Sequence, residues 1–327
     1  MAQVVGGIGT SHSPMLLNDP NGWRERAGQD MSNPALHDNE GVVRTYDELL
    51  AAAGDVYVKE LDDDRWWERH QAVHDAMDRL TAETLVADFD TIVIVGDDQS
   101  EVFDDSIQPT VGIYWGEQWT TSILEHVPPG EFFDNVKTGY AMDKVWTFPG
   151  SPSLGLDLVR STVAQGFDMT SLARVPEGRG FGHAYGFVLR TLLRDRPVGV
   201  VPVLLNTYYP PNQPTSARCY DLGRALTQAV ADSSTAHRVF FAASGGLSHF
   251  VVNDALDRKV LDAIAAGDAA TLRSIPQELL SSGTSEIRNW ITVAGAMADR
   301  EVAWYEYVPC YRTPAGTGCG MAFLRWA

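Results

Sequence analysis

Short runs of almost uninterrupted apolar residues recur along the chain, and longer amphipathic segments separate them. The run 91–95 has almost no polar interruption, which is typical of a strand buried on both faces of a sheet. In 72–85, apolar residues recur at i, i+3, i+4 and i+7, which predicts an amphipathic helix. Strands that alternate with helices predict an α/β fold, with a central, mostly buried β-sheet flanked by helices. Further strands are expected at 4–5, 198–205, 239–241, 304–308 and 321–324, and further helices at 154–165, 184–193, 217–231, 254–265 and 286–298.

One segment breaks this alternation. Residues 18–70 are rich in charged and aromatic side chains and carry little strand signal. We interpret them as a helical N-terminal insertion that covers one edge of the sheet and forms a possible lid over the site. No repeat, low-complexity tract or long linker divides the chain, so we expect a single domain over residues 1–327.

Charge and cysteine content narrow the class of protein. Acidic residues outnumber basic ones by 43 to 25, and a net charge of −18 disfavours binding to nucleic acid or to an anionic membrane. The three cysteines form no CxxC pair, and the N-terminus lacks the basic segment of a signal peptide. The apolar runs are far shorter than the ~20 residues that span a bilayer. We therefore expect a cytoplasmic protein.

Polar clusters directly follow several predicted strands, where ligands gather in open α/β sheets. Three of the clusters contain a histidine, and each imidazole is a candidate metal ligand or proton carrier. The alternative for each is a loop residue held by ordinary hydrogen bonds. The clusters are 9–14 with His12, 96–101 with Gln99, 180–183 with His183, and 244–249 with His249.

Other titratable residues have simpler interpretations. His70 and His74 stand at i, i+4 and could pair on a metal, but their neighbourhood is typical of an exposed helix start. His37 and His126 lie in polar loops, where a structural role is expected. Glu286 follows two residues that can cap a helix, so by itself it indicates a carboxylate that stabilises a helix N-terminus.

Taken together, these motifs resemble one family. The chain carries SHSP near its start, a strand that ends in an Asp-Asp turn, a GFGH helix start, NTYYPP, GGLSH and a late SEI. This order is similar to that of class III extradiol ring-cleavage dioxygenases, in particular the protocatechuate 4,5-dioxygenase catalytic-subunit-like family. The similarity covers most of the chain outside residues 18–70.

The resemblance implies a mononuclear Fe(II) held by two histidines and one glutamate, with open positions for substrate and O₂. His12 matches the first histidine ligand and Glu286 the carboxylate ligand. His249 matches the acid/base histidine. His183 matches a second catalytic histidine that hydrogen-bonds the substrate, and the positive end of the following helix should favour its neutral form.

The second histidine ligand of the family is replaced here by Gln99. Three interpretations follow. Gln99 ligates the metal through its amide oxygen, with Asp97, Asp98 or Glu101 helping. Alternatively, a histidine from the insertion, with His37 the first choice, reaches into the site. In the third, the site has lost its iron.

The implied activity is extradiol cleavage of a catecholic or gallate-type aromatic acid with O₂. Tyr208 and Tyr209 lie on a proline-stiffened loop, where they either bind the substrate or simply pack. We expect a homodimer, because the insertion can cap the pocket without a second subunit. Two alternatives remain open: a non-catalytic subunit of such a dioxygenase, or a metal-dependent hydrolase or lyase that uses the Asp97-Asp98 turn.

Overall fold

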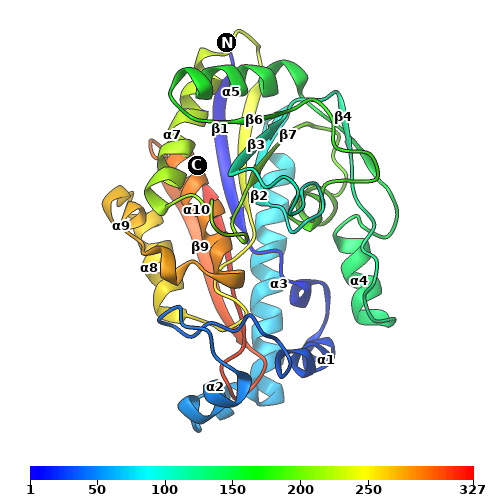
Figure 1. Ribbon diagram of the computed structural model, residues 1–327, viewed down its shortest axis with the longest axis vertical. Coiled ribbons are helices and arrows are strands. Elements are labelled where there is room, and N and C mark those ends of the chain that lie inside the picture. The colour runs from blue at the N-terminus through cyan, green and yellow to red at the C-terminus, as the bar shows by residue number, and fades with distance from the viewer.

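An eight-stranded sheet forms the centre of the molecule, and the computed structural model describes residues 1–327 (Figure 1). The strand order is β6-β3-β7-β2-β8-β1-β10-β9. The four strands β7, β2, β8 and β1 are mutually parallel, whereas β10 runs antiparallel to β1 and β9 antiparallel to β10. The strands are β1 (Gln3–Thr10), β2 (Thr91–Asp97), β3 (Val111–Tyr114), β6 (Thr170–Leu172), β7 (Gly199–Leu205), β8 (Arg238–Ser244), β9 (Val302–Tyr311) and β10 (Gly318–Trp326), with a separate ribbon of β4 (Gln118–Thr120) and β5 (Thr147–Pro149).

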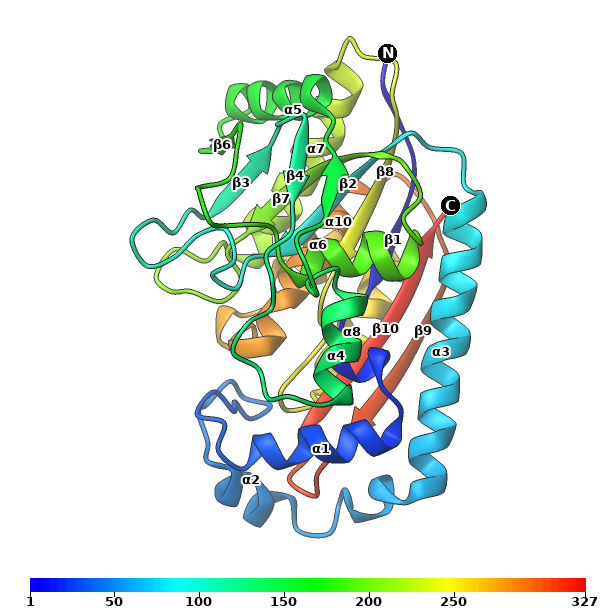
Figure 2. The ribbon, with the colours of Figure 1, turned by 90° about the vertical axis from the view of Figure 1, so that its right-hand side faces the viewer.

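Helices cover both faces of the sheet, and each face has its own apolar core. The α-helices are α1 (Pro20–Asp30), α2 (Tyr46–Ala53), α3 (Asp63–Val86), α4 (Glu131–Gly139), α5 (Pro152–Ala164), α6 (His183–Phe187), α7 (Ser216–Asp232), α8 (Asp254–Ala265), α9 (Ala269–Arg273) and α10 (Ile287–Ala296). Helices α5, α7, α8 and α10 cover one face, and α3, α4 and α6 cover the other (Figures 1 and 2). The expected α/β fold is therefore confirmed.

Most of the predicted elements are present, with small differences at their ends. The expected helix 184–193 consists of α6 and a π-helical turn, Val188–Leu192. The expected helix 286–298 begins as a 3₁₀ turn, Ser282–Glu286, which leads directly into α10. Other 3₁₀ turns are Pro14–Leu17, Val58–Leu61 and Gln277–Leu279. No helix is long and apolar enough to cross a membrane.

The segment 18–70 contains α1, α2 and the start of α3, so the expected helices are present, and residues 31–45 between α1 and α2 form turns and an isolated β-bridge. Helices α1 and α2 lie together at one end of the molecule, and α3 runs along β9 and β10 at the edge of the sheet (Figure 2). Whether the segment opens and closes as a lid stays a prediction.

The topology brings the polar clusters to one edge of the sheet. Because β1, β2 and β8 are parallel and adjacent, their last residues, Thr10, Asp97 and Ser244, lie at the same edge. The loops that follow these three strands therefore meet one another there.

Candidate metal centre

His12 follows β1 and is held in one tautomer. The Ser244 hydroxyl donates to the carbonyl of Ala184 at 2.6 Å, so its oxygen accepts a hydrogen bond from Nδ1 of His12 at 3.1 Å. This leaves Nε2 of His12 facing the buried Glu286 carboxylate, 3.3 Å away. A histidine whose Nδ1 is fixed in this way is typical of a metal ligand, because the outer hydrogen bond orients the ring.

Glu286 lies at the centre of the site and has no exposed surface. One carboxylate oxygen accepts from the backbone N–H of Gly246 at 2.6 Å, and the other accepts from the Tyr208 hydroxyl at 3.2 Å. Burial alone raises the pKa of Glu286, but the neighbouring His249 and His12 outweigh it and hold the pKa well below its usual range. Gly245 has a φ of +118°, and a methyl group there would come within 2.5 Å of the carboxylate. The carboxylate is therefore ionised and tightly enclosed.

Asp97, the last residue of β2, adds a second buried carboxylate. Its oxygens accept from the side-chain amides of Gln99 at 3.0 Å and Asn289 at 3.4 Å. Burial, and then the charge of Glu286, raises the pKa of Asp97. Two buried carboxylates so close together repel each other, so the site favours a bound cation.

Gln99 lies among these groups but presents its nitrogen to them. Its Nε2 donates to Asp97 and, at 3.3 Å, to Glu286, and lies 3.4 Å from Nε2 of His183. The amide oxygen of Gln99 is not the atom that faces the carboxylates. Ligation through this oxygen therefore stays a prediction. Among the expected helpers, Asp97 is part of the site. Asp98 instead accepts from the backbone N–H groups of Val102 and Phe103.

His183 begins α6 and is oriented by Glu101, whose carboxylate lies 2.7 Å from Nδ1. Its Nε2 consequently faces Asp97, 3.8 Å away. Burial alone lowers the pKa of His183, but the Glu101 carboxylate outweighs it and raises the pKa to about 10. The expectation that the helix dipole keeps this imidazole neutral is therefore wrong, because a contacting carboxylate acts more strongly than the end of a five-residue helix.

His249 lies in the loop after β8 and faces the Glu286 carboxylate. Its Nδ1 donates to the carbonyl of Leu247 at 3.0 Å, and its Nε2 lies 3.3 Å from Glu286 and 3.4 Å from the Tyr208 hydroxyl. Burial lowers the pKa of His249, but Glu286 outweighs it, so the net shift is upward. Tyr208 faces the centre, whereas the Tyr209 hydroxyl accepts a hydrogen bond from Ser100.

His37, His70 and His74 take no part in the centre. His37 hydrogen-bonds the carbonyl of Ala35 through Nδ1 and does not line the cavity described below, so the interpretation in which it reaches the metal is wrong. The rings of His70 and His74 are tilted by 44°, with centroids 4.2 Å apart, beside a separate cavity, and no third donor lies near enough to complete a metal site.

The donor atoms of His12, Asp97, His183 and Glu286 all lie within 4.8 Å of one another. Ligands about 2 Å from one ion lie roughly 3 to 4 Å apart, so this group fits a single divalent metal. The sequence predicted Asp97 only as an additional ligand beside Gln99, and it did not predict that Ser244 and Glu101 orient the histidines. The only indication of these roles was that the residues lie at the ends of the same strands or in the loops that follow them.

A cavity of about 640 Å³ opens from these residues. It is lined by His12, Gln99, His183, Tyr208, His249 and Glu286 at one end, and by Arg26, Gln29, Tyr140, Phe250 and Arg312 elsewhere. Its volume suits a small organic ligand.

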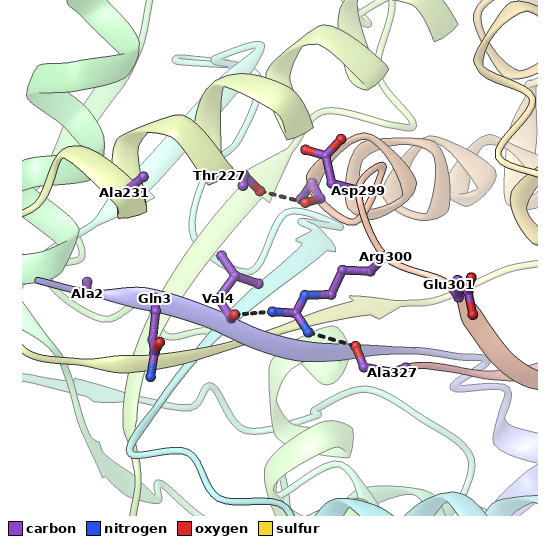
Figure 3. Close-up of a pocket in the computed structure, with 10 residues that line it drawn as sticks. Ala2, Gln3, Val4, Thr227, Ala231, Asp299, Arg300, Glu301 and Ala327 are labelled. Carbon is purple, nitrogen blue, oxygen red and sulfur yellow. Dashed lines mark hydrogen bonds between the residues drawn. The ribbon is translucent and has the colours of Figure 1, made fainter.

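Another cavity, of about 550 Å³, lies near both chain termini and is drawn in Figure 3. There Arg300 donates to the backbone carbonyls of Val4 and Ala327. This cavity is lined by no histidine or cysteine, so it has no comparable group of metal donors.

Comparison with known proteins places the chain in a family. Residues 57–321 match the family described as the catalytic LigB subunit of aromatic ring-opening dioxygenase, and the chain belongs to that family. A gallate dioxygenase of Pseudomonas putida is 26% identical over 185 residues, which cover 54% of this chain and 53% of that protein. The chain thus spans about half the length of this curated relative. Residues 1–56, which include His12, lie outside the matched family region.

Proposed function

We propose that this protein uses Fe(II) and O₂ to open the ring of a catecholic or gallate-type aromatic acid beside its diol. The observation that carries the proposal is the convergence of two histidines and two carboxylates, His12, Asp97, His183 and Glu286. Three of them, His12, His183 and Glu286, line a ligand-sized cavity. Membership in a family of ring-opening dioxygenases supports it. The named activity of the Pseudomonas putida relative supports the gallate-type substrate.

These four residues would hold the iron, and histidine nitrogens with carboxylate oxygens are the donors that non-haem Fe(II) oxygenases use. His183 would then serve as a ligand in place of the substrate hydrogen-bonding role that the resemblance implies, and a bound cation would displace the proton from its Nε2. When bound, Fe(II) would bring the diol and O₂ together and lower the pKa of the diol hydroxyls. Gln99 donates to both carboxylates and so orients them. Ligation by Gln99 itself is the alternative.

His249 is the proposed proton carrier. Its Nδ1 is fixed by the Leu247 carbonyl, so the proton that moves is the one at Nε2, which faces Glu286 and the Tyr208 hydroxyl. An imidazole in this position accepts a proton from a substrate hydroxyl and returns it later in the reaction. Tyr208 holds the Glu286 carboxylate by donating to it and contacts the bound ring. Both atoms of O₂ enter the product, so the reaction needs no external electron donor.

Oxygen consumption tests the proposal directly. Protein loaded with Fe(II) under nitrogen is mixed with O₂ and with gallate, 3-O-methylgallate or protocatechuate. We expect one O₂ consumed per ring opened with at least one of these acids. His249→Gln should lower kcat by about 10²- to 10⁴-fold, the usual contribution of a general acid or base, while the protein still binds iron. Iron binding without oxygen consumption for every substrate would contradict the proposed activity.

The replacement of the family's second histidine by Gln99 favours one other function, that of a non-catalytic subunit. In that case the purified chain would consume no O₂ alone, and activity would appear only in a complex with a homologue that has the complete ligand set. Turnover under nitrogen would instead indicate a hydrolase or lyase.

The homodimer also stays a prediction, which sedimentation equilibrium can test.

A further inference from the structure

Arg26 is a cation that lines the cavity without a carboxylate partner. It lies on α1, and its guanidinium donates to the side-chain oxygen of Gln29 at 2.6 Å. No carboxylate lies within salt-bridge distance of it, whereas the two other arginines that line the cavity are paired. Arg312 binds Asp30 through two nitrogens, and Arg179 binds Asp104.

Asp30, a candidate partner for Arg26, is already paired with another arginine. Its two oxygens accept from Nε and Nη2 of Arg312, and one of them also accepts from the Thr317 hydroxyl. Burial, and then the charge of Arg312, lowers the pKa of Arg26 to about 10, so the guanidinium stays charged at neutral pH. A partly buried cation without a carboxylate partner is unfavourable, and a ligand carboxylate would remove this cost.

Arg26 also lies close to the reactive end of the cavity. Its guanidinium lies 5.7 Å from the ring centroid of Phe250, and that ring lies 5.4 Å from the ring of the adjacent His249. Its charge acts on Tyr140, whose hydroxyl donates to the carbonyl of His12 at 2.5 Å. Arg26 and the metal donors His12, His183 and Glu286 therefore line the same cavity and share Phe250 and Tyr140 as neighbours.

We propose that Arg26, assisted by Gln29, binds the carboxylate of the substrate and so selects aromatic acids over uncharged catechols. A guanidinium forms two parallel hydrogen bonds to a carboxylate, and the amide of Gln29 can add a third. The bound carboxylate neutralises Arg26 and orients the ring with its diol toward His12 and Glu286. This inference rests on the proposed function for the identity of the diol end, but the anchor itself can be tested by binding alone.

Calorimetric titration under nitrogen measures the affinity for gallate and for its uncharged methyl ester. In the wild-type protein, gallate should bind more tightly than the ester. Arg26→Gln should weaken gallate binding by about 10- to 100-fold and leave the affinity for the ester nearly unchanged. Arg26→Lys keeps the charge but loses the paired N–H groups, so its affinity for gallate should lie between those of the wild type and Arg26→Gln. Arg24→Gln, on an exposed side chain of the same helix that pairs with Asp63, is the matched control and should behave as wild type.

Comparison of gallate with its ester distinguishes a specific contact between Arg26 and the carboxylate from a general disturbance of the cavity. An Arg26→Gln variant that loses both ligands equally, or neither, overturns the proposal, as does the absence of saturable gallate binding to the wild-type protein. Thermal unfolding of each variant shows whether it is folded. If gallate binding depends on Arg26 but no ring opening occurs, the proposed activity fails and the anchor stands. If rings open and Arg26→Gln retains the preference for the acid, the anchor fails and the activity stands.

Discussion

Gln99 stands where the resemblance to the ring-cleavage dioxygenases implies a second histidine ligand, and its contacts in the structure are specific. Its amide nitrogen lies among Asp97, His183 and Glu286 and donates to both carboxylates. An amide is a neutral and weaker ligand than imidazole, so the remaining carboxylates and histidines carry most of the attraction for a cation.

Replacing Gln99 by histidine tests whether this side chain faces the metal. An imidazole added to the four donors should tighten Fe(II) binding by about tenfold or more, because imidazole is the better ligand for Fe(II). The affinity is measured by titration of the anaerobic protein with Fe(II). Gln165→His, at an exposed position at the end of α5, controls for the mere addition of a histidine. Equal affinity for all three proteins would show that side chain 99 does not reach the ion.

Residue by residue, the sequence identified the histidines and the glutamate of the site but not the groups that orient them. His12, His183, His249 and Glu286 stand in recognisable motifs at element boundaries, and the structure brings them together. Arg26 could not be singled out, because the sequence does not show which arginines of a charged helix are buried or lack a partner.

Asp257 provides a pH-dependent prediction away from the metal donors. It is fully buried, accepts from the backbone N–H and hydroxyl of Ser248 and from the Tyr307 hydroxyl, and so holds the loop of His249. Burial raises its pKa from 3.8 to about 7. The folded state therefore binds this proton more tightly than the unfolded state, so stability falls as pH rises from about 4 to 7 and levels off above the folded pKa.

Asp257→Asn removes this titration. The free energy of unfolding of the wild type, relative to that of the variant, should fall by up to roughly 4 kcal/mol between pH 4 and pH 8. Urea unfolding of both proteins across that range measures the difference. A difference in unfolding free energy that stays constant across this pH range would contradict the assignment of a raised pKa to Asp257.

At the level of elements, long periodic segments were predictable and short ones were not. The hydrophobic patterns of α5, α7 and α8 locate these helices to within two residues of their observed ends. The strands β3 and β6, of four and three residues, are too short to show a period, and they are fixed by pairing with distant strands. The 3₁₀ start of α10 depends on contacts of Glu286 that local sequence does not contain.

The close packing of α7 on α10 depends on Gly223. A methyl group at this position would lie 1.8 Å from the carbonyl oxygen of Thr292, so Gly223→Ala should push the helices apart and cost about 1–3 kcal/mol despite the higher helix propensity of alanine. Gly28→Ala in α1, where no atom lies within 4 Å of the added methyl, should stabilise by about 0.4–1 kcal/mol. Chemical unfolding of the two variants should therefore shift in opposite directions. A neutral or stabilising Gly223→Ala would show that the helices can separate without cost.

At the scale of the whole molecule, the site depends on bringing distant parts of the chain together. His12 follows the first strand, Asp97 ends the second, and Glu286 precedes the last helix, yet their donor atoms converge because β1, β2 and β8 are parallel neighbours. The sequence predicted the class of fold and that the site lies where the strands end. It did not predict the strand order, which determines which loops meet. A cation bound there would link β1, β2 and α10.

Equilibrium binding of Fe(II) to the protein under nitrogen is the most direct test of this account. The wild-type chain should bind one ion, and His37→Ala should bind it equally well, because His37 does not line the cavity. His12→Ala and Glu286→Gln should each weaken binding by at least about 100-fold, because both remove a proposed ligand. Absence of Fe(II) binding to the wild-type protein, or unchanged affinity in both ligand variants, would contradict the proposed metal centre.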